Sequence, residues 1–255
     1  VISGREDFLE KDPQGELTQE AFPVSQSDAL LATNAVYATI RDWAYHSGGY
    51  PILDIMSDDA HKGSNPNDQL PTLGPYDKFA HNSTQDGLGR WWSALYEGIK
   101  RANVVIENVP SIAMNIPLRD RYVAEARFLR GLYYFDLVRA FGGVPLVTSA
   151  TPPTTVPRST KEEIYDLIVE DLLFAAANLP EKSALDPQDA GRATRGAAKS
   201  LLAKAYLFQG DFINAEKYVL EVILSDEYDL EAVFTDANGK NGEHGIESVF
   251  EVGAM

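Results

Sequence analysis

The longest densely apolar segment of the chain runs from Tyr122 to Phe141. Drawn as a helix, it carries aromatic or aliphatic residues around most of its circumference, which is typical of a helix buried on all sides. Gly142 and Pro145 predict its end, because glycine adopts the left-handed conformation that closes a helix and proline cannot continue it. Gly131 costs about 1 kcal/mol relative to alanine inside a helix, so it predicts close approach of a neighbouring helix. The pattern therefore predicts a central helix with other helices packed around it.

Apolar residues at positions i, i+3, i+4 and i+7 predict further helices on both sides of this segment. Asp28, Thr194 and Asp211 are suitable N-cap residues, and Thr160 with Glu163 forms a capping-box pattern. The expected helices cover residues 28–45, 91–109, 160–178, 194–209 and 211–224.

The last two of these helices have the spacing of a tetratricopeptide repeat. Leu202, Ala203, Tyr206, Gly210 and Ala215 occupy its small and aromatic positions. Small residues let two helix backbones approach each other, and the tyrosine fills the space above them. The sequence therefore predicts a mainly α fold of tetratricopeptide-like helical hairpins, with long irregular loops and a little β.

The β expectation comes from residues 246–252, whose alternating apolar pattern is typical of a strand. A strand requires a partner strand, so we expect the chain to be the N-terminal part of a longer protein. We interpret residues 1–255 as one domain with an extended lead-in at 1–27, irregular loops at 46–90 and a helical scaffold at 91–228.

Composition excludes several classes of function. The formal net charge of −16 argues against a nucleic-acid partner and against electrostatic docking on anionic lipid. The absence of cysteine excludes disulfides, cysteine-ligated zinc and thiol catalysis. No apolar run is long enough to predict a transmembrane helix. No G-x-S-x-G or phosphate-loop pattern occurs either, so we expect a protein that is not an enzyme.

The irregular segment 46–90 is the first candidate for a ligand-binding face, because a loop of this length in a compact domain is usually functional or disordered. Its aromatic residues and histidines argue against disorder. Asp58, Asp59 and His61, together with Asp54, can accept hydrogen bonds from sugar hydroxyls or ligate calcium. The plainer interpretation is a solvated acidic loop. The spacing does not support a calcium site, and we expect no cofactor.

Aromatic residues supply the other candidate ligand contacts. Tyr76 and Phe79, with Tyr50, are candidates for a platform beneath a sugar ring. Trp91 is a further candidate, because it lies off the apolar stripe to which Trp92 belongs. We therefore expect Trp92 in the core and Trp91 at the start of its helix. The alternative for each candidate is an anchor beneath the preceding loop.

Five charged residues interrupt the central helix: Glu125, Arg127, Arg130, Asp136 and Arg139. Charges on a buried helix must be paired, because an unpaired buried charge costs several kcal/mol. We expect them to form ion pairs between helices that set the register of the bundle, in preference to a catalytic role.

Several segments together resemble the SusD/RagB family of nutrient-binding outer-membrane lipoproteins. They are collinear and cover nearly the whole chain: Asp7–Glu10 with Pro13, Trp92–Asn103, Ala124–Pro145, Gly191–Tyr206 and Glu247–Glu251. The resemblance implies a helical tetratricopeptide-like scaffold with an irregular ligand-binding face. It also implies non-enzymatic binding of a glycan, or in some members a peptide, for delivery to a SusC-like TonB-dependent transporter.

The same resemblance implies surface exposure on the outer membrane through an N-terminal lipid anchor. This sequence departs from the family in lacking the lipidated cysteine, and family members are considerably longer. Two alternatives remain open from the residues. One is a tetratricopeptide adaptor for protein partners, and the other is a glycosidase that uses two carboxylates.

Overall fold

The computed structural model describes residues 22–63, 65, 67–68, 72–237, 239 and 242–252, without the side chains of residues 47, 48, 50 and 51. Most of the expected lead-in lies outside this part. The predicted mainly α fold is confirmed. The helical segments, in chain order, are α1 (Gln26–Ala38), α2 (Trp43–Tyr50), a π-helical turn η2 (Pro51–Ile55), α3 (Gly74–Asp77), α4 (Asp86–Asn108), η3 (Val109–Ser111), α5 (Ile116–Phe141), α6 (Lys161–Asn178), η4 (Lys182–Ala184), η5 (Pro187–Asp189), α7 (Arg195–Gln209), α8 (Phe212–Ile223) and α9 (Phe234–Ala237).

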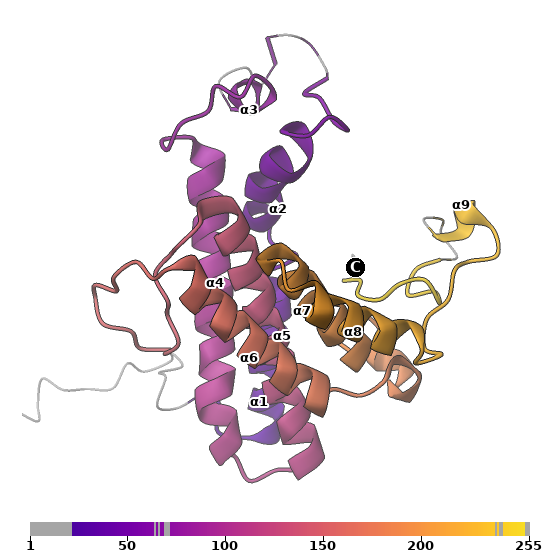
Figure 1. Cartoon of the computed structure of the whole chain (residues 1–255). Helices are drawn as coiled ribbons and strands as arrows, with labels where there is room; N and C mark the ends of the chain where they lie inside the picture. Colours follow the sequence, from indigo (N-terminus) through magenta and orange to yellow (C-terminus); the bar gives the residue numbers. More distant parts are fainter. Residues whose placement is uncertain are drawn as a thin grey trace, which may run out of the picture.

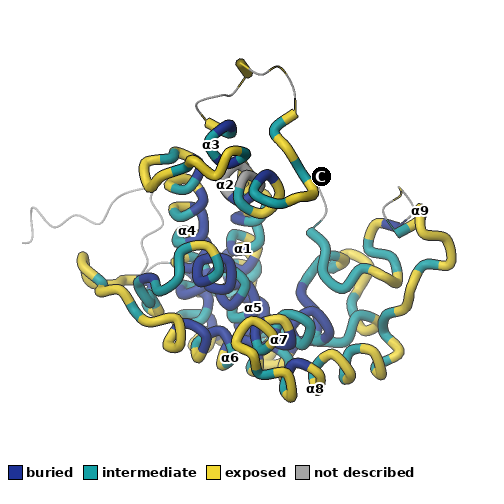
Figure 2. The backbone as a smooth tube through the Cα atoms, turned by 45° about the horizontal axis from the view of Figure 1, so that its top comes forward, coloured by how far each residue is buried: buried dark blue, intermediate teal, exposed yellow. Residues whose placement is uncertain are grey.

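The central helix of the bundle is α5, as the sequence predicts. It packs against α4 and α6 and also contacts α1 and α7 (Figure 1). The tube of α5 is dark blue through the middle of Figure 2, since its residues are buried on most sides. Gly142, at φ 73°, ends the helix. A Cβ added at Gly131 would lie 3.3 Å from Leu172 of α6, which confirms that this glycine permits a close helix contact.

A buried ion pair joins α5 to α6. Arg130 donates from Nε and Nη2 to the carboxylate of Asp171 at 2.7 and 2.8 Å. Its Nη1 donates to Oδ1 of Asn103 on α4 at 2.7 Å. Burial raises the pKa of Asp171, and Arg130 opposes that shift by stabilising the charged form. These contacts tie three helices together, which confirms for Arg130 the predicted ion pairing between helices.

A second buried cluster joins α5 to the segment before α7. Glu125 is fully buried and accepts from Arg121 Nε at 2.9 Å and from Arg192 Nη1 at 2.8 Å. Arg192 also donates to Asn34 of α1 at 2.6 Å. The prediction is wrong for Asp136, which pairs with Arg139 within the same helix. The link from Asp136 to another element is a hydrogen bond from the Tyr45 hydroxyl at 2.7 Å.

The helix expected at residues 28–45 is two helices. Ser25, not Asp28, caps α1, and Asp28 completes the capping box from the third helical position. From Thr39 to Asp42, each backbone amide donates to the carbonyl three residues earlier, so the α-helical hydrogen-bond pattern is interrupted. Asp42 Oδ1 then accepts from the Ala44 amide at 2.7 Å, at the start of α2. An aspartate that caps a new helix explains the break, because its carboxylate satisfies one of the free amides at a helix N-terminus.

The tetratricopeptide-like hairpin is formed by α7 and α8, which lie side by side in Figure 1. Gly210 takes the left-handed conformation between them. Ala203 and Ala215 are buried at their contact. The ring of Tyr206 stacks on that of Tyr218 at 5.8 Å. The small-residue and tyrosine pattern therefore has the packing role that the sequence predicts.

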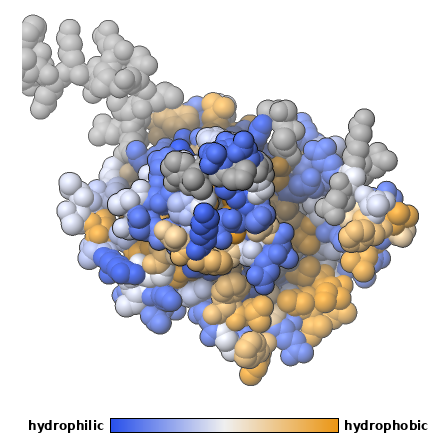
Figure 3. All heavy atoms as spheres, turned by 90° about the horizontal axis from the view of Figure 1, so that it is seen from above, coloured by the Kyte–Doolittle hydropathy of each residue, from blue (hydrophilic) through white to orange (hydrophobic). Residues whose placement is uncertain are grey.

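The outer face of this hairpin is apolar and exposed. Hydrophobic side chains gather toward the lower right of Figure 3, on the side where Figure 2 places α8. The exposed members on α7 and α8 are Leu207, Phe208, Phe212, Ile213, Val219, Leu220 and Ile223. An exposed apolar surface of this kind is often an interaction surface.

Residues 246–252 do not form the expected strand. Within the described ranges, the sole β pairing outside helices is an isolated bridge between Pro145 and Arg158. The segment 246–252 instead forms turns and bends. The Asp229 amide donates a hydrogen bond to the Ile246 carbonyl, but no ladder of such bonds follows in the described residues. Alternation alone does not make a strand, because the conformation is stabilised by hydrogen bonds to a neighbouring strand.

Candidate ligand-binding site

The expected ligand-face segment lies at one end of the bundle, around α2 and α3 (Figure 1, top). It is less irregular than its sequence predicts. The helix α2 extends to Tyr50, η2 follows it, and α4 begins at Asp86 instead of Trp91. Gly49 is accommodated in α2 because α2 crosses α4 closely there. A Cβ added at Gly49 would lie 3.2 Å from the indole of Trp91.

The expectation for the two adjacent tryptophans is right in part for Trp92, which packs against the core, and wrong for Trp91, which is the more deeply buried of the two. Trp91 is 1% exposed and packs beneath α2, with its ring centroid 6.1 Å from that of Phe141. Trp92 is half-buried and meets the Phe141 ring edge to face at 5.0 Å. The expectation that Trp91 presents a ring face to a ligand is therefore wrong for this structure. The side of α4 that looks free along the sequence is covered by α2.

Tyr76 is also an anchor and not an open platform. Its side chain is 1% exposed, and its ring stacks on that of His81 at 5.4 Å. Phe79 differs, because its ring is 68% exposed on a backbone with φ 51°, which is uncommon for a residue other than glycine. In the segment from Tyr76 to His81, the Phe79 ring is therefore exposed, while the rings of Tyr76 and His81 stack on each other. The side chain of Tyr50 lies outside the described part of the chain.

The acidic candidates lie on the neighbouring segment. Asp58 and Asp59 are exposed, and the Asp59 amide donates to Ser57 Oγ at 3.1 Å. His61 Nδ1 lies 3.2 Å from the carboxylate of Asp77, the last residue of α3. The structure therefore brings His61 to the segment that carries Tyr76 and Phe79. In the part of the chain that the structure describes, no three histidine or acidic side chains converge as a metal site.

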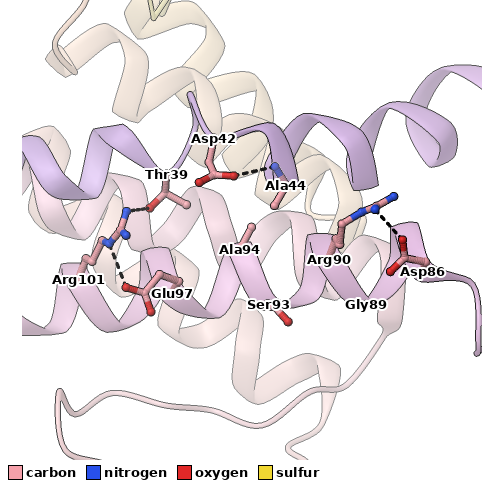
Figure 4. A pocket seen from close by; sticks show the side chains of 10 residues that line it. All are labelled: Thr39, Asp42, Ala44, Asp86, Gly89, Arg90, Ser93, Ala94, Glu97 and Arg101. Carbon is pink, nitrogen blue, oxygen red and sulfur yellow. Dashed lines mark hydrogen bonds and ion pairs between the residues drawn. The ribbon is translucent and has the colours of Figure 1, made fainter.

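A groove that the sequence did not predict lies between the α1–α2 connection and the first half of α4 (Figure 4). Its volume is about 560 Å³, within the usual range for small-molecule sites. Ten residues line it: Thr39, Asp42, Ala44, Asp86, Gly89, Arg90, Ser93, Ala94, Glu97 and Arg101.

Ion pairs organise the walls of this groove. Arg90 Nη1 lies 2.6 Å from Asp86 Oδ2, and Arg101 Nε donates to Glu97 Oε1 at 3.1 Å. Arg101 Nη1 also donates to Thr39 Oγ1 at 3.1 Å. Figure 4 shows Arg101 of α4 reaching Thr39 and Ala94 pointing toward the α1–α2 connection, whereas Ser93 points away from it. Charged groups of both signs therefore line the α4 side of the groove, and Asp42 is the charged residue among those that line the opposite side.

Trp43 is an exposed residue that the sequence pattern hides. In one continuous helix it would share the stripe of Val36, Thr39 and Ile40, and it would be buried. The break at residues 39–42 turns it outward, and its side chain is 76% exposed. The capping capacity of Asp42, directly before Trp43, is the sequence signal that could have revealed this break.

Comparison with known proteins identifies relatives of the chain. Residues 7–207 match the SusD-like family described as starch-binding associating with outer membrane. A SusD-like protein of Formosa agariphila is 31% identical over 186 residues, which are 70% of this chain and 35% of that protein. A SusD-like protein of Bacteroides ovatus is 28% identical over 92% of this chain and 45% of its own length.

Solved structures agree with this assignment. A laminarin-binding SusD-like protein is 31% identical, with a TM-score of 0.76 over 86% of this chain and 50% of its own. Surface glycan-binding protein A of Bacteroides thetaiotaomicron, in complex with laminarihexaose, is 28% identical, with a TM-score of 0.77 over 89% and 49%.

The chain spans about half the length of most of these relatives. Among the described residues, no helix combines the length and apolarity that crossing a bilayer requires. The match to the family covers most of the sequence and the fold, and the chain therefore belongs to the SusD-like family.

Proposed function

We propose that this chain binds a glycan at the cell surface without acting on it chemically. The observation that carries the proposal is the similarity to SusD-like proteins whose names record laminarin binding and a laminarihexaose complex. A neutral glucan of this kind also suits a strongly acidic protein, since an anionic polysaccharide would be repelled by a net charge of −16.

The loop face around α3 is the proposed contact surface. The exposed ring of Phe79 offers an apolar face to the C–H side of a pyranose. Asp58 and Asp59 supply exposed carboxylates that accept hydrogen bonds from hydroxyls, and His61 adds a ring nitrogen. Tyr76 and Trp91 contribute indirectly, because their buried rings hold the loop and the start of α4 in place.

Delivery of the glycan to a SusC-like TonB-dependent transporter is the proposed physiological role. Support comes from the family description, which names association with the outer membrane. The protein would be held at that membrane by an N-terminal lipid anchor. No cofactor is required for such binding, and peptide binding or a tetratricopeptide-type adaptor role is the competing function.

Isothermal titration tests the proposal with laminarihexaose, maltohexaose and an oligogalacturonate as probes. We expect heat of binding with at least one neutral glucan and none with the anionic oligosaccharide. Phe79→Ala should weaken binding about tenfold, while Phe212→Ala should not. Phe212 is a matched control because it is 67% exposed on α8, away from this face.

Two results would contradict the proposal. No binding of any glycan, combined with binding of a peptide library, would favour the competing function. Release of new reducing ends from a glucan would show an enzyme.

A further inference from the structure

We infer that the groove between the α1–α2 connection and α4 is a second sugar-binding subsite, with Trp43 as its stacking residue. The inference rests on the proposed function, because it assigns a neutral oligosaccharide to a surface separate from the Phe79 loop. The groove is not produced by a mobile loop. Its walls are two helical elements and the capped turn between them.

The floor of the groove is small and apolar. Ala94 is buried, and Ala44 forms part of the lining opposite it. A Cβ added at Gly89 would meet no atom within 4 Å, so the space above this glycine is open. A flat, open floor of this kind leaves room for a pyranose ring.

The walls offer both hydrogen-bond donors and acceptors. Arg90 and Arg101 present guanidinium groups, while Asp42, Asp86 and Glu97 present carboxylates. A sugar hydroxyl can donate to one group and accept from another, and this suits a surface where both kinds alternate. The hydrogen bond from Arg101 to Thr39 orients one of these groups before a ligand arrives, and preorganisation reduces the entropic cost of binding.

The charge of the lining favours a neutral ligand. Both guanidinium groups already contact a carboxylate, Arg90 with Asp86 and Arg101 with Glu97. An anion would therefore have to displace an existing ion pair while facing Asp42. A neutral polyhydroxylated molecule avoids this conflict, because it can bridge the paired groups without separating them.

Trp43 is not itself one of the residues that line the groove, but it lies in the chain between Asp42 and Ala44, which are. Its indole is the most exposed of the tryptophans in this chain, since Trp91 is buried and Trp92 half-buried. An indole left in water next to a polar groove is a suitable stacking surface for a sugar ring, because ligand binding removes its apolar face from water.

The experiment combines tryptophan fluorescence with a variant that fills the groove. Laminarihexaose should protect the exposed Trp43 from acrylamide quenching in the unmodified protein. Gly89→Phe places a ring in the open space above α4 and should weaken binding of the hexasaccharide at least fivefold. Trp43→Ala should weaken it to a similar extent and abolish the protectable fluorescence.

Two controls show whether a loss of binding comes from the filled groove and not from the substitution itself or from unfolding. Gly89→Ala adds only a methyl group and should bind like the unmodified protein. Urea unfolding should show that Gly89→Phe remains folded, since its side chain extends into open space.

The outcomes distinguish the two proposals. Binding that is weakened by Phe79→Ala but unchanged by both Gly89→Phe and Trp43→Ala would overturn the groove inference alone. Failure of the unmodified protein to bind any neutral glucan would overturn the groove inference and the proposed function together. A preference of the groove for the oligogalacturonate would also overturn the inference.

Discussion

Gly98 lies where α4 crosses both α1 and α5, and its replacement by alanine tests the packing of the whole bundle. A Cβ at this position would lie 2.5 Å from Cε2 of Tyr133 and 2.9 Å from Cγ2 of Thr39. The most favourable separation of two carbon atoms is about 3.5–4.0 Å. The added methyl group therefore collides with two other helices.

Neither neighbour can easily move away. The Tyr133 side chain is buried, and its hydroxyl donates to the Val36 carbonyl at 2.7 Å. Thr39 is also buried, and its Oγ1 accepts from Arg101 at 3.1 Å. Overpacking of such a site costs about 1–3 kcal/mol. Alanine returns up to about 1 kcal/mol through its higher helix propensity. With the full return from helix propensity, the expected net loss of stability is about 0–2 kcal/mol.

Gly89 provides a matched control on the same helix. A Cβ there meets nothing within 4 Å, so Gly89→Ala should raise stability by about 0.5–1 kcal/mol. Urea unfolding, followed by circular dichroism, measures the free energy of unfolding of both variants. In thermal unfolding, each kcal/mol should shift the melting temperature by about 2–4 °C in a chain of this size. If Gly98→Ala is as stable as Gly89→Ala, the close contact of α4 with α1 and α5 is wrong.

The remaining predictions concern buried side chains. Trp91→Ala should lower stability by about 3–5 kcal/mol and Trp92→Ala by clearly less in thermal unfolding, and the opposite order would contradict the placement of α2. Arg130→Ala leaves Asp171 buried without its partner and should cost about 3–5 kcal/mol in urea unfolding, whereas Arg130→Met with Asp171→Leu should restore most of that loss. Burial raises the pKa of Glu125 above 4.5, so the folded state binds this proton more tightly than the unfolded state. The stability of the unmodified protein relative to Glu125→Gln should therefore increase as pH falls from 7 toward 4.5, and a difference that is constant or decreases would contradict the shift.

Local signals in the sequence were sufficient where one segment determines its own conformation. Thr160 and Glu163 form the predicted capping box, and Gly210 ends α7 as expected. The burial of α5 on most sides also follows from composition, because no rotation of so apolar a helix leaves a polar face for water. The tetratricopeptide-like hairpin belongs to this group, since its two helices are adjacent in the chain.

The candidate site depended on contacts that no local pattern contains. Phe79 was identified because an aromatic residue in a polar loop is conspicuous, and it is exposed. Trp91 and Tyr76 were identified for the same reason, but they are buried by segments that fold over them. The groove and Trp43 were missed because the sequence pattern extends one helix across residues 39–42.

Residue order along the chain was enough to predict the central helix, most helix ends, the exclusion of cysteine chemistry and the family resemblance. The fold was needed to show which tryptophan is buried more deeply and where a groove lies. Helix formation depends on neighbours a few residues apart, whereas the path of α2 across α4 depends on contacts between segments about 40 residues apart. Because α2 covers one side of α4, Trp91 is buried more deeply than Trp92, and a groove lies between the α1–α2 connection and α4.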